Sequence, residues 1–432
     1  MLTGLRLPAT FRAFSHRNYL LWFFGQGISL IGTWMQSMAQ QVLVYRLTGS
    51  AVSLGIISFI GLIPLIPLSL WGGSITDRYP KRTIILATQA VMLAQAFLLA
   101  GLTWRGTVQI WHVYVLAFIL GAANAVDLPA RQAFTVDMIE GKEDLTSAIG
   151  LNSAMFNGAR AIGPAIAGIL VATTGEGNAF FLNGLTFIAV IISLLMMHSL
   201  PASRSQSDAK TSPLKHMAGG LQFILQRKTI LVLISLIAIS AFLSMPYNTL
   251  LPVFASVVLK RSAQPLVAAL CNSNNNIINC QAPEALPLGL LYSMIGVGAV
   301  IGALVVASLP MNAHRGRLLT FGNLAFPLFL MLFAFSTHFS MSLILTFFIG
   351  FSFVWQNAMA NTLLQFVTPD GLRGRVMGVY TMSFQTMFRL GGLQAGFVAD
   401  WLGAPISVGI GAIISLLYGL FVAFRYPKVR EL

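Results

Sequence analysis

The chain has few charged residues and no long polar segment. Only 9% of its 432 residues are charged and 56% are hydrophobic, whereas roughly a quarter of an average soluble domain is charged. Polar interruptions of about 30 residues at most leave no room for a separate soluble catalytic domain. The sequence therefore predicts a membrane protein whose function lies within its membrane-spanning part.

Motifs typical of enzymes and ATPases are also absent from the sequence. It has no paired carboxylates, no histidine-rich motif and no G-x-x-x-x-G-K-[ST] loop, and its six histidines fall in loops or at predicted span ends. These absences argue against a membrane enzyme, an ATP-driven pump and a buried imidazole relay. We expect no enzymatic activity, no cofactor and no metal site.

Hydropathy predicts twelve transmembrane helices, with both termini on the same side of the membrane. Most of the 26 lysines and arginines flank that side, which the positive-inside rule assigns to the cytoplasm. This bias explains the net charge of +14 without a nucleic-acid partner. No cleavable signal is expected, because the first apolar stretch is long enough to span. The predicted spans are 18–40, 50–72, 83–101, 110–132, 146–173, 178–199, 229–256, 288–308, 318–336, 339–362, 376–400 and 404–424.

The polar stretch 201–228 predicts a cytoplasmic linker between two six-helix halves, 1–200 and 229–432, the second of which carries an external loop at 259–287. An offset of 233 residues aligns Asn124 with Asn357. The same offset aligns Gln132 with Gln365, Asp137 with Asp370 and Arg82 with Arg315, and after a short shift Arg160 falls on Arg389. A weak duplication of this kind is typical of transporters built from two pseudo-symmetric halves, with the substrate path between them.

A charged motif follows the second predicted span and consists of Gly73, Asp77, Arg78, Lys81 and Arg82. An acid at the carboxyl end of a helix faces the negative end of the helix dipole and needs positive partners. A simple positive-inside anchor is the alternative. The string G-x-x-x-D-R-x-x-K-R resembles the loop signature of the major facilitator superfamily, and this resemblance implies the major facilitator fold. It also implies that the five residues form a cytoplasmic latch, with the amino end of the eleventh span accepting the acid.

The fifth predicted span carries Gly158, Gly163, Pro164 and Gly168. Small residues let helices approach closely and proline kinks a helix, although glycine is common in any membrane helix. This pattern resembles the glycine-proline motif of the superfamily's exporters. The strings FRAFSHRNYLLWFFGQGISLIGTWMQ, AVDLPARQAF and FNGARAIGPAIAG are similar to bacterial exporters of the enterobactin and macrolide-efflux branch. The resemblance covers nearly the whole chain and implies an exporter of the bacterial inner membrane.

Charges inside predicted spans are the candidates for coupling and substrate binding, because each costs roughly 2.5 to 3.5 kcal/mol at a helix centre. Asp127 stands four residues before Arg131 and is the candidate for coupling. Arg160 and Arg389 are repeat-related and favour an anionic solute. The alternative for Asp127 and Arg131 is a structural ion pair near the interface. The alternative for Arg160 and Arg389 is a fixed bridge to an acid or to backbone carbonyls.

Polar residues repeated along single helix faces predict a water-filled central cavity. Gln36 lies in such a stripe on the first span, Asn124 on the fourth, and Asn357 and Asn361 on the tenth. Hydrogen bonding between helices is the alternative.

The only two cysteines, Cys271 and Cys280, fall in the predicted external loop. A disulfide is permitted on that side, and two free thiols are the alternative. With no histidine or third cysteine beside them, a metal site is not expected there.

These features together predict a secondary active transporter that exports a small amphipathic solute, either a siderophore-like anion or a drug. Alternating access with proton antiport is the expected mechanism. An importer or lipid flippase of the same fold is the alternative, followed by a channel-like or scaffold subunit. Expected partners are the small-molecule substrate, protons and membrane lipids, and the protein is expected to be a monomer.

Overall fold

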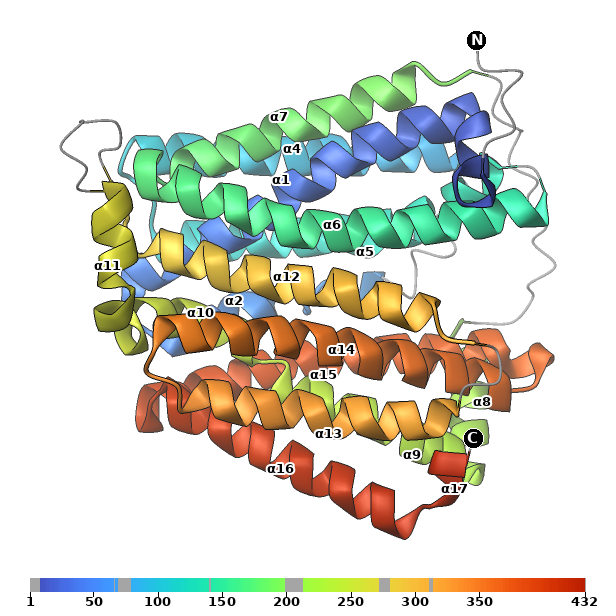
Figure 1. Cartoon of the computed structure of the whole chain (residues 1–432). Coiled ribbons are helices and arrows are strands. Elements are labelled where there is room, and N and C mark those ends of the chain that lie inside the picture. The colour runs from blue at the N-terminus through green and yellow to red at the C-terminus, as the bar shows by residue number, and fades with distance from the viewer. Residues whose placement is uncertain are drawn as a thin grey trace. The chain divides into compact units, whose positions relative to one another are not determined.

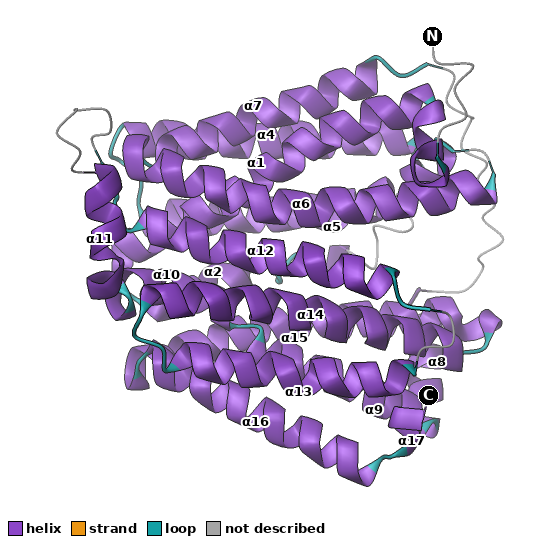
Figure 2. Cartoon of the chain, viewed as in Figure 1, coloured by secondary structure: helices purple, strands orange, loops and turns teal. Residues whose placement is uncertain are grey.

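The computed structural model describes residues 8–65, 67–68, 79–139, 141–198, 213–271, 280–310 and 314–431. Within these ranges every regular element is a helix and there is no β-strand (Figure 2). The predicted all-α fold is therefore confirmed. Helices suit a chain of this composition, because each one satisfies its backbone hydrogen bonds within a single segment.

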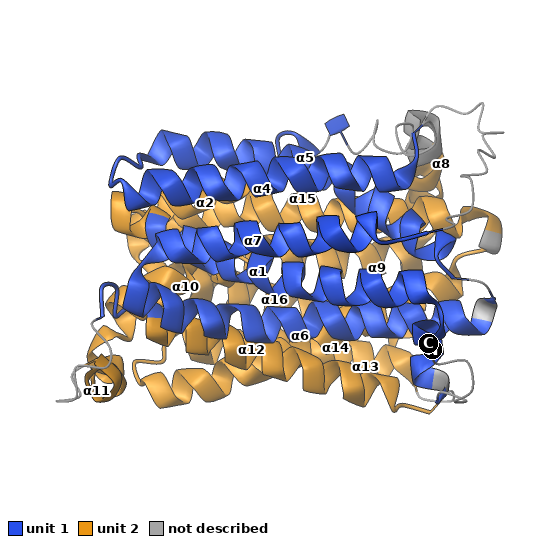
Figure 3. Cartoon of the chain, turned by 90° about the horizontal axis from the view of Figure 1, so that it is seen from above, with its two compact units in different colours: residues 1–43, 60–210, 280–285 blue, residues 44–59, 211–279, 286–432 orange. Residues whose placement is uncertain are grey.

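The helices form two compact units, which Figure 3 colours separately. Unit 1 contains residues 1–43, 60–210 and 280–285, and unit 2 contains residues 44–59, 211–279 and 286–432. Each unit thus includes a short stretch from the other predicted half of the chain. The division into halves at 201–228 stays a prediction about duplication in the sequence.

Unit 1 is held together by helices that pack through large buried side chains. Helix α4 packs on α5 and α7, while η1 packs on α6. Tyr19 and Trp22 share one core with Phe134, and the rings of Trp22 and Phe134 lie 5.6 Å apart. In Figure 1 the helices are η1 (Ala9–Ser15), α1 (Arg17–Thr48, its last turn in unit 2), α4 (Lys81–Trp104), α5 (Ile110–Asp137), α6 (Lys142–Thr174) and α7 (Glu176–Leu195).

Unit 2 has a larger apolar core, in which α13 packs on α14 and α16, and α15 packs on α16. Leu233, Leu319 and Leu363 are almost completely buried there. Its helices are α2 (Ala51–Ile60), α8 (Pro213–Gln226), α9 (Lys228–Ile239), η2 (Ser240–Ser244), α10 (Tyr247–Val253), η3 (Phe254–Val258), α11 (Lys260–Cys271), α12 (Ala285–Ala307), α13 (Arg315–Ala334), α14 (Phe339–Val367), α15 (Asp370–Leu402), α16 (Ala404–Arg425) and α17 (Lys428–Glu431).

The seventh predicted span is one continuous but irregular helix over Lys228–Val258. Two π-helical turns, η2 and η3, interrupt it, and Pro246 and Pro252 lie beside them. Proline removes a backbone donor, so the helix locally changes its hydrogen-bond spacing.

Nine helices of the described ranges are long and apolar enough to cross a membrane, and they coincide with nine predicted spans. Helices α1 and α15 are 32 and 33 residues long and cover two further spans. These two carry more polar residues and fall outside that group. Helix α2 is shorter than the predicted span at 50–72: it ends at Ile60, a turn follows at 61–64, and residues 66 and 69–78 are not described.

The exposed side chains of both units suit a lipid surrounding. Phe424 is 80% exposed and Trp401 is 84% exposed, whereas soluble proteins rarely expose apolar residues over a wide area. Trp104 and Trp111 are also exposed and, like Trp401, lie at predicted external helix ends. Tryptophan gathers at membrane interfaces, so these three positions fit an aromatic belt.

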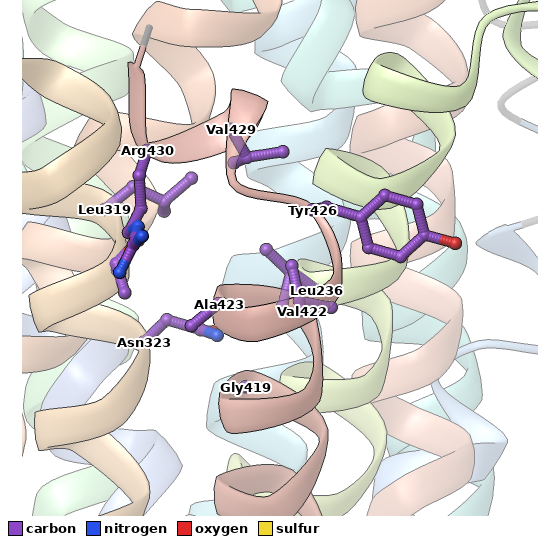
Figure 4. A pocket seen from close by; sticks show the side chains of 10 residues that line it. Leu236, Leu319, Asn323, Gly419, Val422, Ala423, Tyr426, Val429 and Arg430 are labelled. Carbon is purple, nitrogen blue, oxygen red and sulfur yellow. The ribbon is translucent and has the colours of Figure 1, made fainter.

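Unit 2 encloses a cavity of about 10 Å³ beneath the chain's last helix (Figure 4). Asn323, Gly419, Tyr426 and Arg430 are among the residues that line it. A volume of this size holds about one water molecule. The cavity is too small for an organic solute and does not mark the transported ligand.

Candidate functional site

The charged motif at the second span is only partly described. Gly73, Asp77 and Arg78 lie outside the described residues, whereas Lys81 and Arg82 begin α4. Lys81 Nζ donates to both Asp137 carboxylate oxygens, at 2.9 and 2.7 Å. Arg82 donates to the Leu195 carbonyl at 3.2 Å. These two cations therefore join the ends of α4, α5 and α7, and the latch at Asp77 stays a prediction.

Asp137 is a site residue that the sequence reasoning did not select. It ends α5, where the helix dipole disfavours a negative charge. The same rule that predicted a cationic partner for Asp77 applies to Asp137. That signal was present in the sequence and would have paired Asp137 with Lys81.

Asp127 and Arg131 meet on one face of α5, as their spacing predicts. Arg131 Nε donates to Asp127 Oδ2, and the two side chains are only 14% and 5% exposed, arginine first. Removing two charges from water is costly, so a buried pair persists only when further hydrogen bonds satisfy it.

Two neighbouring helices, α4 and α1, supply those further bonds. Thr88 Oγ1 of α4 donates to Asp127 Oδ1 at 2.6 Å, and Gln89 Nε2 donates to the same oxygen at 3.4 Å. Gln26 Oε1 of α1 accepts a bond from Arg131, whose guanidinium lies 5.6 Å from the centroid of the Trp22 ring. The result is a charged cluster of Gln26, Thr88, Gln89, Asp127 and Arg131, called below the Asp127 cluster.

The sequence identified only part of this cluster as a candidate site. Thr88 and Gln89 are adjacent polar residues in a mainly apolar span, and that pair was the available signal. Its register against Asp127 depends on how α4 packs on α5, which single-helix periodicity does not reveal. A second buried acid, Glu176, is 1% exposed at the start of α7 and was also missed.

Arg160 lies on α6 beside the Trp34 ring, which itself packs on the Phe156 ring. Its guanidinium carbon is 5.8 Å from the centroid of Trp34, and the Trp34 and Phe156 rings are 5.7 Å apart, edge to face. A guanidinium over an indole gains a cation-π interaction. Trp34 therefore belongs to the surroundings of Arg160.

Arg389 lies in unit 2 and contacts the backbone of α2. It donates from one terminal nitrogen to the Ser58 carbonyl at 3.2 Å. Its Nε is buried and has no hydrogen-bond partner among the described residues. The bond to Ser58 is the bridge to a backbone carbonyl that the sequence offered as an alternative. It uses only one of the five N–H donors of the guanidinium.

Gln36 joins helices within unit 1. It is 2% exposed, donates to Gln95 Oε1 at 3.0 Å and accepts from Asn183 at 2.7 Å. This amide network ties α1 to α4 and α7. The arrangement fits helix–helix hydrogen bonding, the alternative to a cavity lining at this position.

The three predicted asparagines each form a hydrogen bond within their own helix, and Asn357 also accepts one from α15. Asn124 donates to the Leu120 carbonyl at 2.9 Å and Asn357 to the Phe353 carbonyl at 3.1 Å. Tyr380 Oη donates to Asn357 at 3.4 Å, and Gln365 donates to Asn361 at 2.9 Å.

The glycine-proline motif contributes one close helix contact among its four residues. A Cβ atom at Gly163 would collide with the Ile31 carbonyl and with Trp34 on α1, whereas one at Gly158 would meet open space. Pro164 lies inside α6, and Gly168 is buried. Gly163 is therefore the position at which α6 needs a residue without a side chain.

Cys271 ends α11, and Cys280 follows the stretch 272–279, which lies outside the described ranges. Both cysteines are described, and neither is a free thiol. Their pairing with each other stays a prediction, which mass measurement without reductant tests.

Comparison with known proteins gives matches over almost the whole chain. The Staphylococcus aureus "Staphyloferrin A transporter" is 24% identical over 411 residues, which cover 95% of this chain and 96% of that protein. The Shigella boydii "Enterobactin exporter EntS" is 24% identical over 402 residues, covering 93% and 87% respectively. By name, the first relative transports staphyloferrin A and the second exports enterobactin.

The fold matches solved transporters as well. The crystal structure of nucleoside transporter NupG superposes with a TM-score of 0.68 at 13% identity, covering 97% of this chain and all of that one. This likeness supports the major facilitator fold alone. The family model described as "Transmembrane secretion effector" matches residues 9–432. The chain is thus a multi-pass membrane transporter that belongs to the transmembrane secretion effector family of the major facilitator superfamily.

Proposed function

We propose that this protein exports a small amphipathic anion of the siderophore class across the bacterial inner membrane by proton antiport. The family description and the names of the two relatives support the solute class and the outward direction. The positive-inside bias supports a cytoplasmic location for both termini. The observation that carries the mechanism is the buried Asp127 cluster, because a hydrophobic core does not need an ionised pair at this position in order to pack.

Asp127 is the proposed proton carrier. Its carboxylate accepts bonds from Thr88, Gln89 and Arg131. Protonation would neutralise the carboxylate and free Arg131 to change partner. A buried ion pair with two exchangeable arrangements can bias an alternating-access equilibrium. One conformation of the transporter is then stabilised by the ionised Asp127 carboxylate and the other by its protonated form.

Arg160 and Arg389 are the proposed anion-recognition residues, one in each half of the repeat. Asp127 is already paired with Arg131, so the net charge of these four residues is positive. Arg160 adds the aromatic faces of Trp34 and Phe156, which suit a solute with a flat apolar part. Cationic dyes are expected to be poor substrates.

Transport by the purified protein in proteoliposomes tests the proposal. With an imposed pH gradient, a catecholate siderophore should accumulate and ethidium should not. Asp127→Asn should abolish uphill accumulation but leave exchange of labelled for unlabelled solute. Accumulation in the opposite direction would indicate an importer, and ethidium transport without binding of any anion would reject the proposed substrate class.

Two matched variants test the arginines separately. Arg160→Gln and Arg389→Gln should each raise the KM for the anion and leave that of a neutral macrolide competitor unchanged. Equal effects on both solutes would mean that the arginines support packing rather than recognition.

A further inference from the structure

One carboxylate joins the first turn of α2 to the last turn of α15. Asp400 Oδ2 accepts a hydrogen bond from Ser50 Oγ at 2.6 Å, and its Oδ1 accepts one from the Ala51 N–H, also at 2.6 Å. Ala51 begins α2, so its N–H is one of the four that a helix leaves without an internal partner. A side chain of one helix therefore caps the other.

The position of Asp400 is not explained by its own helix. It lies in the last turn of α15, where the helix dipole disfavours an acid. Gly403, with φ +90°, ends that helix and returns its N–H to the Ala399 carbonyl at 2.8 Å. This turn fixes Asp400 at the helix end, and the amino end of α2 supplies the favourable partial charge.

Below this cap the two helix backbones touch. A Cβ atom at Gly396 would collide with the Ala51 carbonyl, and one at Gly55 with the Gly392 carbonyl. Arg389 then bonds the Ser58 carbonyl at the inner end of the contact. We call this contact, 50–58 against 389–400, the α2–α15 seam. Its Asp400 end is the one predicted to face the outside.

The repeat contains a corresponding contact in unit 1 that lacks the acid. Near the end of α6, the Ala172 carbonyl accepts N–H bonds from Gln281 at 2.7 Å and Ala282 at 3.2 Å, just before α12 begins. Helix α6 corresponds to α15 in the predicted repeat, and α12 to α2. The Ala172 carbonyl is the acceptor in the unit 1 contact. The Asp400 carboxylate of the α2–α15 seam is therefore a specific addition.

We propose that Asp400 is an external latch residue, which holds the start of α2 against the end of α15 and must release α2 during each transport cycle. Together with the predicted contact of Asp77, it gives α2 an acid-to-helix contact at either end. Release breaks two hydrogen bonds and leaves the Ala51 N–H and the carboxylate to water. This inference depends neither on the solute nor on the coupling ion.

Thiol accessibility of the seam tests the latch. Ser58→Cys places a reporter in the seam, where position 58 is half-buried, and neither native cysteine is a free thiol. A membrane-impermeant maleimide, added outside intact cells, measures the labelling rate of the reporter. Adding Asp400→Ala should raise this rate about fivefold, because loss of a helix cap typically costs about 1 kcal/mol of stability, which corresponds to about that ratio.

Matched variants separate a latch from a general loss of structure. Asp400→Asn keeps one acceptor oxygen and should give an intermediate rate. Glu143→Gln removes a negative charge from the exposed pair with Arg12, at the predicted cytoplasmic end, and should leave the rate unchanged. A purely structural role would lower the thermal midpoint of Asp400→Ala without changing the labelling rate.

The proposal is wrong if Asp400→Ala folds normally and labels at the reference rate. Should that variant fail to fold, Ser50→Ala tests the same contact, because it removes the 2.6 Å bond to the Asp400 carboxylate. It also removes the acceptor of the Ser53 N–H, a longer bond of 3.4 Å at the start of α2. Faster labelling with Ser50→Ala supports the latch, and an unchanged rate overturns it. No substrate is needed, so the result is independent of the proposed transport function.

Discussion

Helices α5 and α14 are counterparts in the predicted repeat, and they differ most in their buried charged residues. Asn124 and Asn357 correspond, and each bonds the carbonyl four residues before it. The same offset pairs Asp127 with Ala360 and Arg131 with Leu364. Ala360 and Leu364 are completely buried in the apolar core of unit 2. One helix therefore holds an ion pair where its counterpart holds an alanine and a leucine.

On the predicted repeat, this difference indicates that a six-helix half can be built with an apolar pair at these two positions. An apolar pair of suitable volume is often as stable as a buried ion pair, or more so, because it avoids desolvation. The charges in α5 are retained at a cost, which is the pattern expected of residues that serve transport. Replacing the charged residues of α5 by the aligned residues of α14 should therefore separate the effect on the free energy of unfolding from the effect on transport.

The largest stability effect is expected from breaking the pair on one side only. Arg131→Leu copies the residue of α14 but leaves Asp127 buried without its cation. Removing one partner of a buried pair typically costs about 3 to 5 kcal/mol. Denaturant titration of the purified protein in mixed micelles measures this loss. A change below about 1 kcal/mol would mean that Thr88 and Gln89 alone satisfy the carboxylate.

The double variant Asp127→Ala with Arg131→Leu completes the exchange and should recover most of that loss, about 3 kcal/mol, since no charge remains buried. Proton-driven accumulation in proteoliposomes should be lost all the same. Recovery of stability without transport would support a coupling role for the Asp127 cluster. A double variant that still accumulates solute against a gradient would remove the cluster from the proposed mechanism.

The next largest loss of stability is expected from a substitution on α6. This helix and its counterpart α15 are both 33 residues long, and each is followed by a glycine of positive φ, Gly175 or Gly403. Gly163→Ala should cost about 1 to 3 kcal/mol, because its Cβ would collide with the α1 backbone. Gly158→Ala is the matched control on the same helix, with open space at its Cβ. Equal thermal midpoints for the two variants would contradict a close approach at Gly163.

Much of the fold was predictable because it depends on properties local to each helix. Apolar runs long enough to span gave the nine membrane helices, and the spacing of four residues placed Arg131 beside Asp127. The seventh span was predicted within two residues at either end, although its two π-helical turns were not. Such turns depend on tertiary packing as well as on proline.

The partners of the candidate residues were less predictable, because they depend on the rotation of each helix about its own axis. Gln36 was placed on a cavity-facing stripe, yet its amide is buried between α4 and α7. Asp400 ends the predicted span 376–400, where the helix dipole calls for a positive partner, but the sequence does not show that the start of α2 supplies it. Hydropathy gives the existence of a helix but not its facing neighbour.

The smallest effect is expected where a pair reaches solvent. Lys81 and Asp137 are 18% and 28% exposed, and they join α4 to α5 at the predicted cytoplasmic end. Water screens such a pair, so Lys81→Met should cost about 1 kcal/mol or less in unfolding free energy, far below the loss predicted for Arg131→Leu. The two variants, measured in the same micelles, remove the cation from an acid that is 28% exposed, Asp137, and from one that is 5% exposed, Asp127. Similar losses would show that burial does not set the cost of breaking these pairs, and the contrast between α5 and α14 would lose its energetic basis.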